Sequence, residues 1–234
     1  MELGIADNLR KVLEALPEGV RLVAVSKYHP AESILEAYHA GQRIFGESHA
    51  QELVQKATAL PQDIRWHFIG HLQTNKVKYV APYVAMIESV DSLKLLREIE
   101  KQGARCGRCI DVLLELHIAQ EATKYGFSPT ECHTLLAEGE WRTMKHVRIC
   151  GLMMMASHVE DATIIAHEFE EAHRCFELLR REFFTDSSSF CECSWGMSHD
   201  YPIAVQHGAT LVRVGTAIFG NRSRKIKKER LLQK

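Results

Sequence analysis

One lysine, Lys27, stands where a lysine side chain can do covalent chemistry. It follows an apolar run at residues 20–25 that is typical of a short strand buried on both faces. A lysine at the end of such a strand is costly to keep charged, so we expect its pKa to be lowered. The neutral amine is the form that condenses with an aldehyde to give a Schiff base. The alternative is a surface lysine just past the strand.

A second group of residues, near the end of the chain, has the composition of an anion site. Residues 194–198 (SWGMS) and 214–216 (VGT) are expected in loops after two further strands, and they supply Ser198, Gly215 and Thr216. Glycine lets the backbone approach an anion closely, while hydroxyl and backbone N–H groups donate hydrogen bonds to it. We therefore expect a phosphate group to bind here. The alternative is a pair of tight turns built from small residues.

Arg213 lies within an otherwise apolar run, TLVRVGTAIF at residues 210–219. A buried guanidinium without a partner is very costly, so this side chain must face a ligand or find a partner. A lysine, a phosphate site and an inward arginine together describe a site for pyridoxal 5′-phosphate. Its aldehyde would meet Lys27 and its pyridine nitrogen would face Arg213. Because arginine does not accept a proton, that nitrogen would stay unprotonated, which weakens the ring as an electron sink.

The segments that must position these residues alternate between strand-like and helix-like patterns along the whole chain. A helix is expected over residues 1–16, before the first strand. The other strands are expected at residues 43–45, 65–69, 84–89, 110–118, 147–155, 190–193 and 210–219. The helices between them are expected at residues 31–40, 50–59, 75–80, 93–102, 129–138, 161–184 and 202–207.

About eight strand–helix units is the number that closes a barrel. The sequence therefore predicts the α/β class, as a single (β/α)8 (TIM) barrel with an extra N-terminal helix. In this fold the loops after the strands gather on one face, which would bring Lys27 to the predicted phosphate site. An open doubly wound sheet is the alternative, but no G-x-G-x-x-G turn follows the first strand.

Composition limits the partners of the chain. It has 234 residues, of which 46% are hydrophobic and 25% charged, with a net charge of −1, so no overall field draws it to nucleic acid or membrane. We expect residues 1–221 to form the barrel and residues 222–234 to form a basic tail. A solvated helix is expected in that tail, and weak anion or RNA binding is the alternative. Without a signal-like or membrane-length segment, we expect a cytoplasmic monomer with no nucleic-acid or membrane partner.

Seven cysteines, an odd number, do not suggest a disulfide framework. Cys106 and Cys109 have the spacing of a zinc or redox pair, while Cys191 and Cys193 flank one residue. The second pair lacks the usual two-residue gap of a zinc site. Alternate residues of a strand point the same way, so we expect Cys191 and Cys193 to be buried core thiols and no metal to bind. A zinc site made from all four is the alternative.

Several segments resemble the pyridoxal phosphate homeostasis protein family, whose barrel is related to that of the alanine racemases. The resemblance extends to about Asn221 and rests on AVSKYHP, FGESHAQEL, WHFIGHLQTNK, IESVDS, KYGF, GLMMMASH, SWGMSHD and LVRVGTAIFG. It implies that Lys27 forms the Schiff base and that Arg213 faces the pyridine nitrogen. It also implies that the phosphate is held by Ser198, Gly215 and Thr216.

The chain departs from the family pattern at one place. Where the family has FGEN-Y, this chain has Gly46-Glu47-Ser48-His49. The family asparagine lies beside the cofactor, so Ser48 is expected at the cofactor with a changed contact.

The resemblance implies a protein that buffers and delivers pyridoxal 5′-phosphate in the cell, with the apo forms of enzymes that use this cofactor as partners. We expect no efficient catalysis and assign no catalytic residue. Alanine racemases carry a C-terminal β-domain and take a second acid–base group, a tyrosine, from a partner subunit. We expect no counterpart of that domain after the eighth strand, so a two-base reaction would lack its second base. An amino-acid racemase or related lyase that acts through Lys27 is the alternative.

Overall fold

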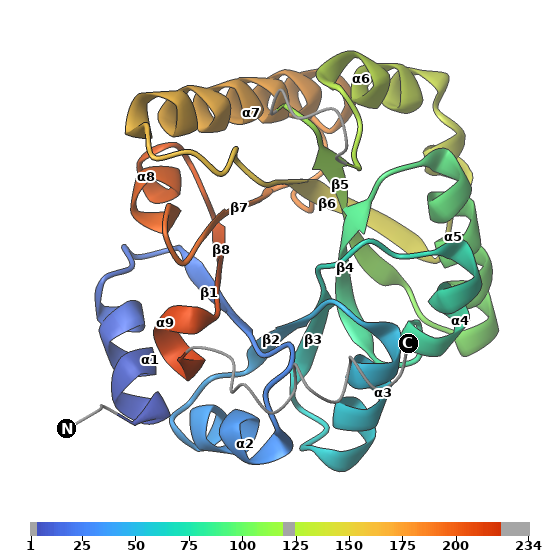
Figure 1. Ribbon diagram of the computed structural model, residues 1–234. Helices are drawn as coiled ribbons and strands as arrows, with labels where there is room; N and C mark the ends of the chain where they lie inside the picture. The colour runs from blue at the N-terminus through green and yellow to red at the C-terminus, as the bar shows by residue number, and fades with distance from the viewer. Residues whose placement is uncertain (1–3, 119–124, 221–234) are drawn as a thin grey trace, which may run out of the picture.

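Eight parallel strands close into a barrel, in the order β1 to β8 around the ring. The protein is seen here in a computed structural model that describes residues 4–118 and 125–220, so the basic tail predicted at residues 222–234 lies outside the described residues. Figure 1 looks along the barrel axis, with the strands as the central ring and the helices around it. The predicted (β/α)8 fold is confirmed. The predicted N-terminal helix is present as α1, which lies beside α2 and α9.

The strands are β1 Arg21–Val25, β2 Ile44–Glu47, β3 Arg65–Phe68, β4 Val84–Val90, β5 Ile110–Leu116, β6 Val147–Met154, β7 Glu192–Met197 and β8 Leu211–Val214. The α-helices are α1 Ile5–Glu14, α2 Ala31–His39, α3 Ala50–Ala59, α4 Val77–Val80, α5 Leu93–Cys106, α6 Pro129–Glu138, α7 Ala162–Phe183, α8 Tyr201–Gln206 and α9 Thr216–Phe219. Two 3-10 turns, η1 Thr74–Lys76 and η2 Glu140–Thr143, complete the described elements.

Local sequence sets the ends of the helices. The Ser92 side chain accepts from the N–H of Leu95 at the start of α5, and Gly107 ends that helix with a φ of 62°. Ser128 and Glu131 form a reciprocal capping box at the start of α6. These caps satisfy N–H groups that the first turn leaves without a helical partner.

The core has an inner layer within the barrel and an outer layer between strands and helices. The inner layer, called here the barrel floor, consists of Val23, Met86, Leu113, Cys150, Met153 and Leu211. Successive strand residues point to opposite faces, so positions two apart share the inward face. Two positions after Met86, Leu113 and Leu211, the inward residue is charged: Glu88, Glu115 and Arg213. A buried charged layer therefore lies above the barrel floor, towards the carboxyl ends of the strands.

The predicted strand at residues 210–219 is wrong in its second half, where the chain forms α9. The N–H groups of Ile218 and Phe219 both donate to the carbonyl of Gly215, at 2.9 Å. Both side chains are buried in the outer core layer. A four-residue helix is too short to show a period of 3.6, so its apolar residues matched the strand pattern equally well.

The predicted strand at residues 190–193 is displaced, because β7 runs through the segment that we expected to be a loop. Ser194 was read as a loop residue, yet it is buried inside the barrel. Its hydroxyl donates to Glu88 at 2.5 Å and accepts from Arg213 at 2.6 Å. Hydrogen bonds to these two charged side chains therefore allow a polar residue inside the barrel, where the apolar pattern of the predicted strands did not lead us to expect one.

The prediction that Cys191 and Cys193 are both buried is confirmed for Cys193 and wrong for Cys191. Cys193 is buried in β7, but Cys191 precedes the strand and is exposed. Cys106 ends α5 and is half-buried, while Cys109 is exposed. Within the described part of the chain, no group of three or more His, Cys, Asp or Glu side chains is arranged to hold a metal ion. In the same part, no helix combines the length and apolar character needed to cross a membrane.

Candidate functional site

A cavity of about 170 Å³ opens at the carboxyl ends of β1, β7 and β8. Ligand pockets commonly measure about 300–1,000 Å³, so this one suits a ligand with a single ring better than a dinucleotide. Its lining residues are Val25, Lys27, His29, Ile69, Met155, Met197, Ser198, Arg213, Gly215 and Thr216. Five of the six predicted site residues are among them, and the sixth, Ser48, is not.

Strand order explains why residues from the two ends of the chain meet. The first strand, β1, pairs with the last, β8, in a register that places Val23 beside Arg213. On its other side β8 pairs with β7, where Arg213 is level with Met197. The turns after these strands therefore lie side by side, as Figure 1 shows.

Lys27 lies in a sharp turn directly after β1. Its neighbour Tyr28 has a φ of 68°, and no other non-glycine residue in the described ranges has a positive φ. An aromatic residue in this conformation is strained and persists only where its surroundings hold it. The Tyr28 N–H donates to Glu52 Oε1 at 2.5 Å, and the N–H of His29 donates to the carbonyl of Ser26 at 3.0 Å. The turn that carries the lysine is thus fixed on both sides.

The predicted phosphate residues join the turns after β7 and β8. The Gly215 N–H donates to Ser198 Oγ at 3.2 Å. A Cβ atom at Gly215 would lie 3.0 Å from the carbonyl oxygen of Val25, so the residue type allows the turn to approach β1 closely. Thr216 follows in the first turn of α9. Ser198, Gly215 and Thr216 therefore line one small cavity together with Lys27.

Arg213 is 4% exposed and lines the same cavity. One terminal nitrogen donates to the carbonyl and to the hydroxyl of Ser194, both at 2.6 Å. The other terminal nitrogen donates to the carbonyl of Met154 at 2.8 Å. A guanidinium has five N–H groups, so these three bonds leave donors for a ligand in the cavity.

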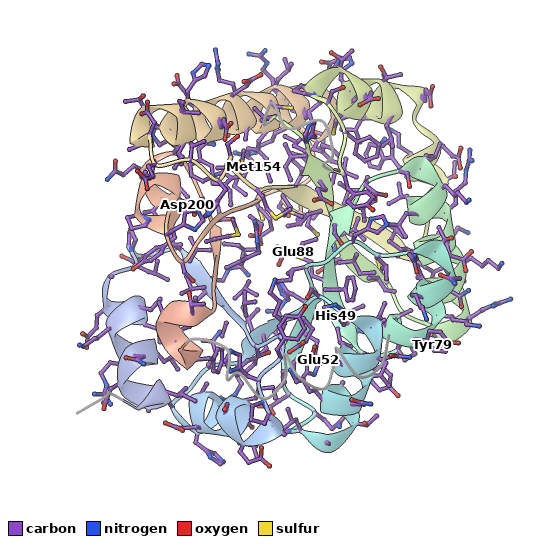
Figure 2. All side chains as sticks on the ribbon, viewed as in Figure 1. His49, Glu52, Tyr79, Glu88, Met154 and Asp200 are labelled. Atoms are coloured by element: carbon purple, nitrogen blue, oxygen red, sulfur yellow. The ribbon has the colours of Figure 1, made fainter. Side chains whose placement is uncertain are left out.

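Glu88 supplies the counter-charge of Arg213. Its carboxylate lies 3.7 Å from the guanidinium and accepts from Ser194 Oγ at 2.5 Å, and its other oxygen lies 2.6 Å from His67 Nδ1. Figure 2 shows Glu88 in the middle of the ring of strands. Burial alone would raise the pKa of Glu88, but the hydrogen bond and charge of His67 and the charge of Arg213 hold it below its usual value. The buried arginine therefore faces an ionised acid.

Two further effects of burial act on this charged layer. Burial lowers the pKa of Arg213, and the carboxylates of Glu88, Asp200 and Glu115 partly offset that effect. Burial also raises the pKa of Glu115 to about 7, with a further rise from Asp91 and an opposing effect of Arg213. Glu88 is therefore a carboxylate that stays ionised near Arg213, while the charge of Glu115 depends on pH near neutrality.

Ser48 lies directly after β2 and lines a neighbouring cavity of about 460 Å³, together with His71 and Lys76. Its hydroxyl lies 3.2 Å from His49 Nδ1. The structure does not bring Ser48 together with the other predicted site residues, and its contact with a cofactor stays a prediction.

Sequence reasoning missed two kinds of site residue. Met155, Met197 and Ile69 line the cavity because each lies at or just beyond a strand end, a position that could have been read from the predicted strands. Glu88 was missed although it lies in an apolar strand run, VAMIESV. That is the same signal that singled out Arg213.

Comparison with known proteins shows the family of this chain. Residues 4–223 match the alanine racemase N-terminal domain. The pyridoxal phosphate homeostasis protein of Aquifex aeolicus is 35% identical, over 93% of this chain and 95% of that protein. The Homo sapiens protein of the same name is 34% identical, over 94% of this chain and 88% of the human protein.

Solved structures show the same likeness. PipY of Synechococcus elongatus without PLP gives a TM-score of 0.86 at 36% identity, over 92% of this chain and all of PipY (100%). PipY with PLP bound gives 0.84. Alanine racemase from Bartonella henselae gives 0.72 at 16% identity, over 93% of this chain and 58% of the racemase, which is a likeness of fold alone. This chain therefore belongs to the pyridoxal phosphate homeostasis protein family, and its barrel is of the alanine racemase N-terminal domain kind.

Proposed function

We propose that this protein binds pyridoxal 5′-phosphate as a Schiff base on Lys27 and serves to buffer and deliver it. One observation carries the proposal: a single cavity brings Lys27 together with Ser198, Arg213, Gly215 and Thr216. The relative PipY has been solved with PLP bound.

The donors in the cavity suit the chemical groups of the cofactor. The hydroxyls of Ser198 and Thr216 and the nearby backbone suit a phosphate. The remaining N–H groups of Arg213 can donate to an unprotonated ring nitrogen, which is an acceptor. When bound, the cofactor supplies an aldehyde that condenses with an amine and a ring that withdraws electrons.

The same residues argue for storage and against efficient turnover. Arg213 is held as a cation beside Glu88, so it donates to the ring nitrogen and does not protonate it. An unprotonated ring stabilises a carbanion poorly. We extend the proposal to a cytoplasmic location and to apo enzymes that use this cofactor as its recipients.

A racemase or lyase is the second candidate, and His29 is the residue that favours it. In the lining drawn from the described residues, the ionisable side chains are Lys27, His29 and Arg213. The His29 ring lies 5.0 Å from that of Phe219, at an angle of 29°. A two-base reaction needs a second group on the opposite face of the substrate, and His29 would have to supply it.

Borohydride reduction of the cofactor-loaded protein, followed by peptide mapping, tests the attachment point. We expect the reduced adduct on Lys27, and we expect Lys27→Ala to lose the absorption band of the bound cofactor. Lys76→Ala is the matched control, because Lys76 lies on the same face of the barrel in the neighbouring cavity. An adduct on another lysine, or a band unchanged in Lys27→Ala, would refute the proposal.

A further inference from the structure

An ionic cluster of two buried side chains and one half-buried side chain contacts the turn that carries Lys27. Lys56 of α3 is 8% exposed, and its amine donates to Glu47 Oε1 at 2.8 Å and to Glu52 Oε1 at 2.7 Å. Its third hydrogen bond goes to the carbonyl of Ser26 at 2.8 Å. All three donors of the ammonium group are therefore used. We call Glu47, Glu52 and Lys56 the α3 cluster.

The α3 cluster forms hydrogen bonds with the backbone on both sides of Lys27. On the near side, Lys56 holds the carbonyl of Ser26, whose hydroxyl donates to Glu47 at 2.6 Å. On the far side, Glu52 accepts from the N–H of Tyr28 at 2.5 Å. One carboxylate oxygen of Glu52 thus binds both the ammonium of Lys56 and the strained residue next to Lys27.

Side chains reinforce this connection. The rings of Tyr28 and His49 lie 5.2 Å apart, and His49 Nδ1 lies 3.8 Å from the second oxygen of Glu52. Figure 2 shows His49 and Glu52 close together on the α3 side of the barrel. The turn after β1 is therefore fixed to the start of α3 and not only to its own strand.

Stability alone does not account for the cluster. Burying an ion pair costs desolvation that its attraction does not reliably repay, and in some proteins the role of such a pair is to select one conformation. Here Glu47 Oε2 is buried, and no described group donates to it. Burial raises the pKa of Glu47 to about 7, an effect that the charge of Lys56 only partly offsets. The backbone that this costly arrangement contacts is that of the left-handed residue Tyr28.

We propose that Glu52, held in place by Lys56, is a positioning residue for Lys27: it fixes the strained turn that directs the lysine amine into the cavity. The proposal rests on the proposed function, since it concerns the residue to which the cofactor attaches. Without the Glu52 acceptor, Tyr28 would relax to a negative φ and the peptide next to Lys27 would rotate.

The test compares three variants of the full chain. Glu52→Ala removes the acceptor, and Glu52→Gln keeps an amide oxygen that accepts from the Tyr28 N–H without the charge. Glu100→Ala is the matched control, because Glu100 of α5 is also half-buried and accepts from the N–H groups of Lys145 and His146. That contact lies before β6, at the opposite end of the barrel from the cavity.

The first measurement is amide hydrogen exchange at Tyr28 in the cofactor-free protein. We expect exchange to be at least about tenfold faster in Glu52→Ala, which corresponds to about 1.4 kcal/mol. A smaller increase is expected in Glu52→Gln and none in Glu100→Ala. Unchanged exchange in Glu52→Ala would show that Glu52 does not hold the turn.

The second measurement is equilibrium titration with pyridoxal 5′-phosphate. We expect about tenfold weaker binding in Glu52→Ala, partial recovery in Glu52→Gln, and less than a twofold change in Glu100→Ala. Equal losses in Glu52→Ala and Glu100→Ala would overturn the positioning role, because any loosened loop would then have the same effect. Peptide mapping of the wild-type adduct separates the two proposals: attachment away from Lys27 refutes the proposed function, while exchange at Tyr28 still tests the hold on the turn.

Discussion

Removing the charge of Glu88 should destabilise the protein strongly, because it leaves Arg213 without its counter-charge. Glu88→Gln removes the charge and keeps an oxygen that can accept from Ser194, while its amide nitrogen would face His67 Nδ1. Arg213 is 4% exposed and Glu88 is fully buried, at 0%. Breaking a buried ion pair by removing one partner costs about 3–5 kcal/mol. For a domain of this size that range corresponds to a fall in Tm of roughly 6–20 °C.

The assay is urea unfolding of the cofactor-free protein, followed by circular dichroism at pH 7.5. Arg213→Met with Glu88→Gln completes a double-mutant cycle, and we expect the double variant to be more stable than the sum of the single changes, by about 1–3 kcal/mol. Glu140→Gln is the control. It removes an exposed ion pair in which a carboxylate oxygen of Glu140 lies 2.6 Å from a terminal nitrogen of Arg97. That change should leave the free energy of unfolding nearly unaltered.

A loss below about 1 kcal/mol in Glu88→Gln would refute this reasoning, since a buried guanidinium cannot lose its partner so cheaply. Additive single changes would refute it as well. Such results would mean that Ser194 and the carbonyl of Met154 satisfy Arg213 without a charge.

Three further predictions concern the cofactor, the chemistry and pH. Ser198→Ala and Thr216→Ala should each weaken binding of pyridoxal 5′-phosphate roughly ten- to a hundredfold in an equilibrium titration, because each removes a hydrogen bond to a charged group worth about 1.5–3 kcal/mol; an unchanged affinity would place the phosphate elsewhere. Solvent deuterium exchange at the α-carbon of alanine, followed by NMR and chiral analysis, should be slow and proceed with retention, since Lys27 serves one face; rapid exchange with inversion would restore the racemase. Glu115→Gln should gain stability relative to the wild type as the pH rises from 5 to 8. The raised pKa of about 7 keeps Glu115 neutral in the folded protein at pH 5. Ionising it while buried costs about 1.4 kcal/mol for each unit by which its pKa is raised on folding. An equal difference in stability between variant and wild type at the two pH values would contradict this.

The fold was predictable because its signal is repeated. Each strand of a parallel barrel is buried on both faces, so a run such as RLVAV at Arg21–Val25 stands out from the helices around it. The carboxyl-end rule then placed Lys27, Ser198, Arg213, Gly215 and Thr216 on one face, and the structure brings them to one cavity.

What failed was local detail that depends on tertiary partners. The position of β7 was missed because Ser194 is polar, and only Glu88 and Arg213 make a polar residue acceptable inside the barrel. The role of Glu52 was equally hidden. From sequence, a glutamate on an amphipathic helix is expected to be a solvated residue. Only the structure shows that the backbone N–H of the strained Tyr28 donates to it.

The barrel floor has a consequence for how the ligand can travel. Within the described residues, six buried apolar side chains fill the barrel interior below the charged layer, so this interior is closed towards the amino ends of the strands. A molecule that reaches Lys27 from this side enters and leaves past the same rim, formed by the carboxyl ends of β1, β3, β6, β7 and β8. A recipient protein that takes the ligand directly must therefore cover that rim. Its footprint should fall there and spare the amino ends of the strands, whereas release into solvent would leave no footprint at all.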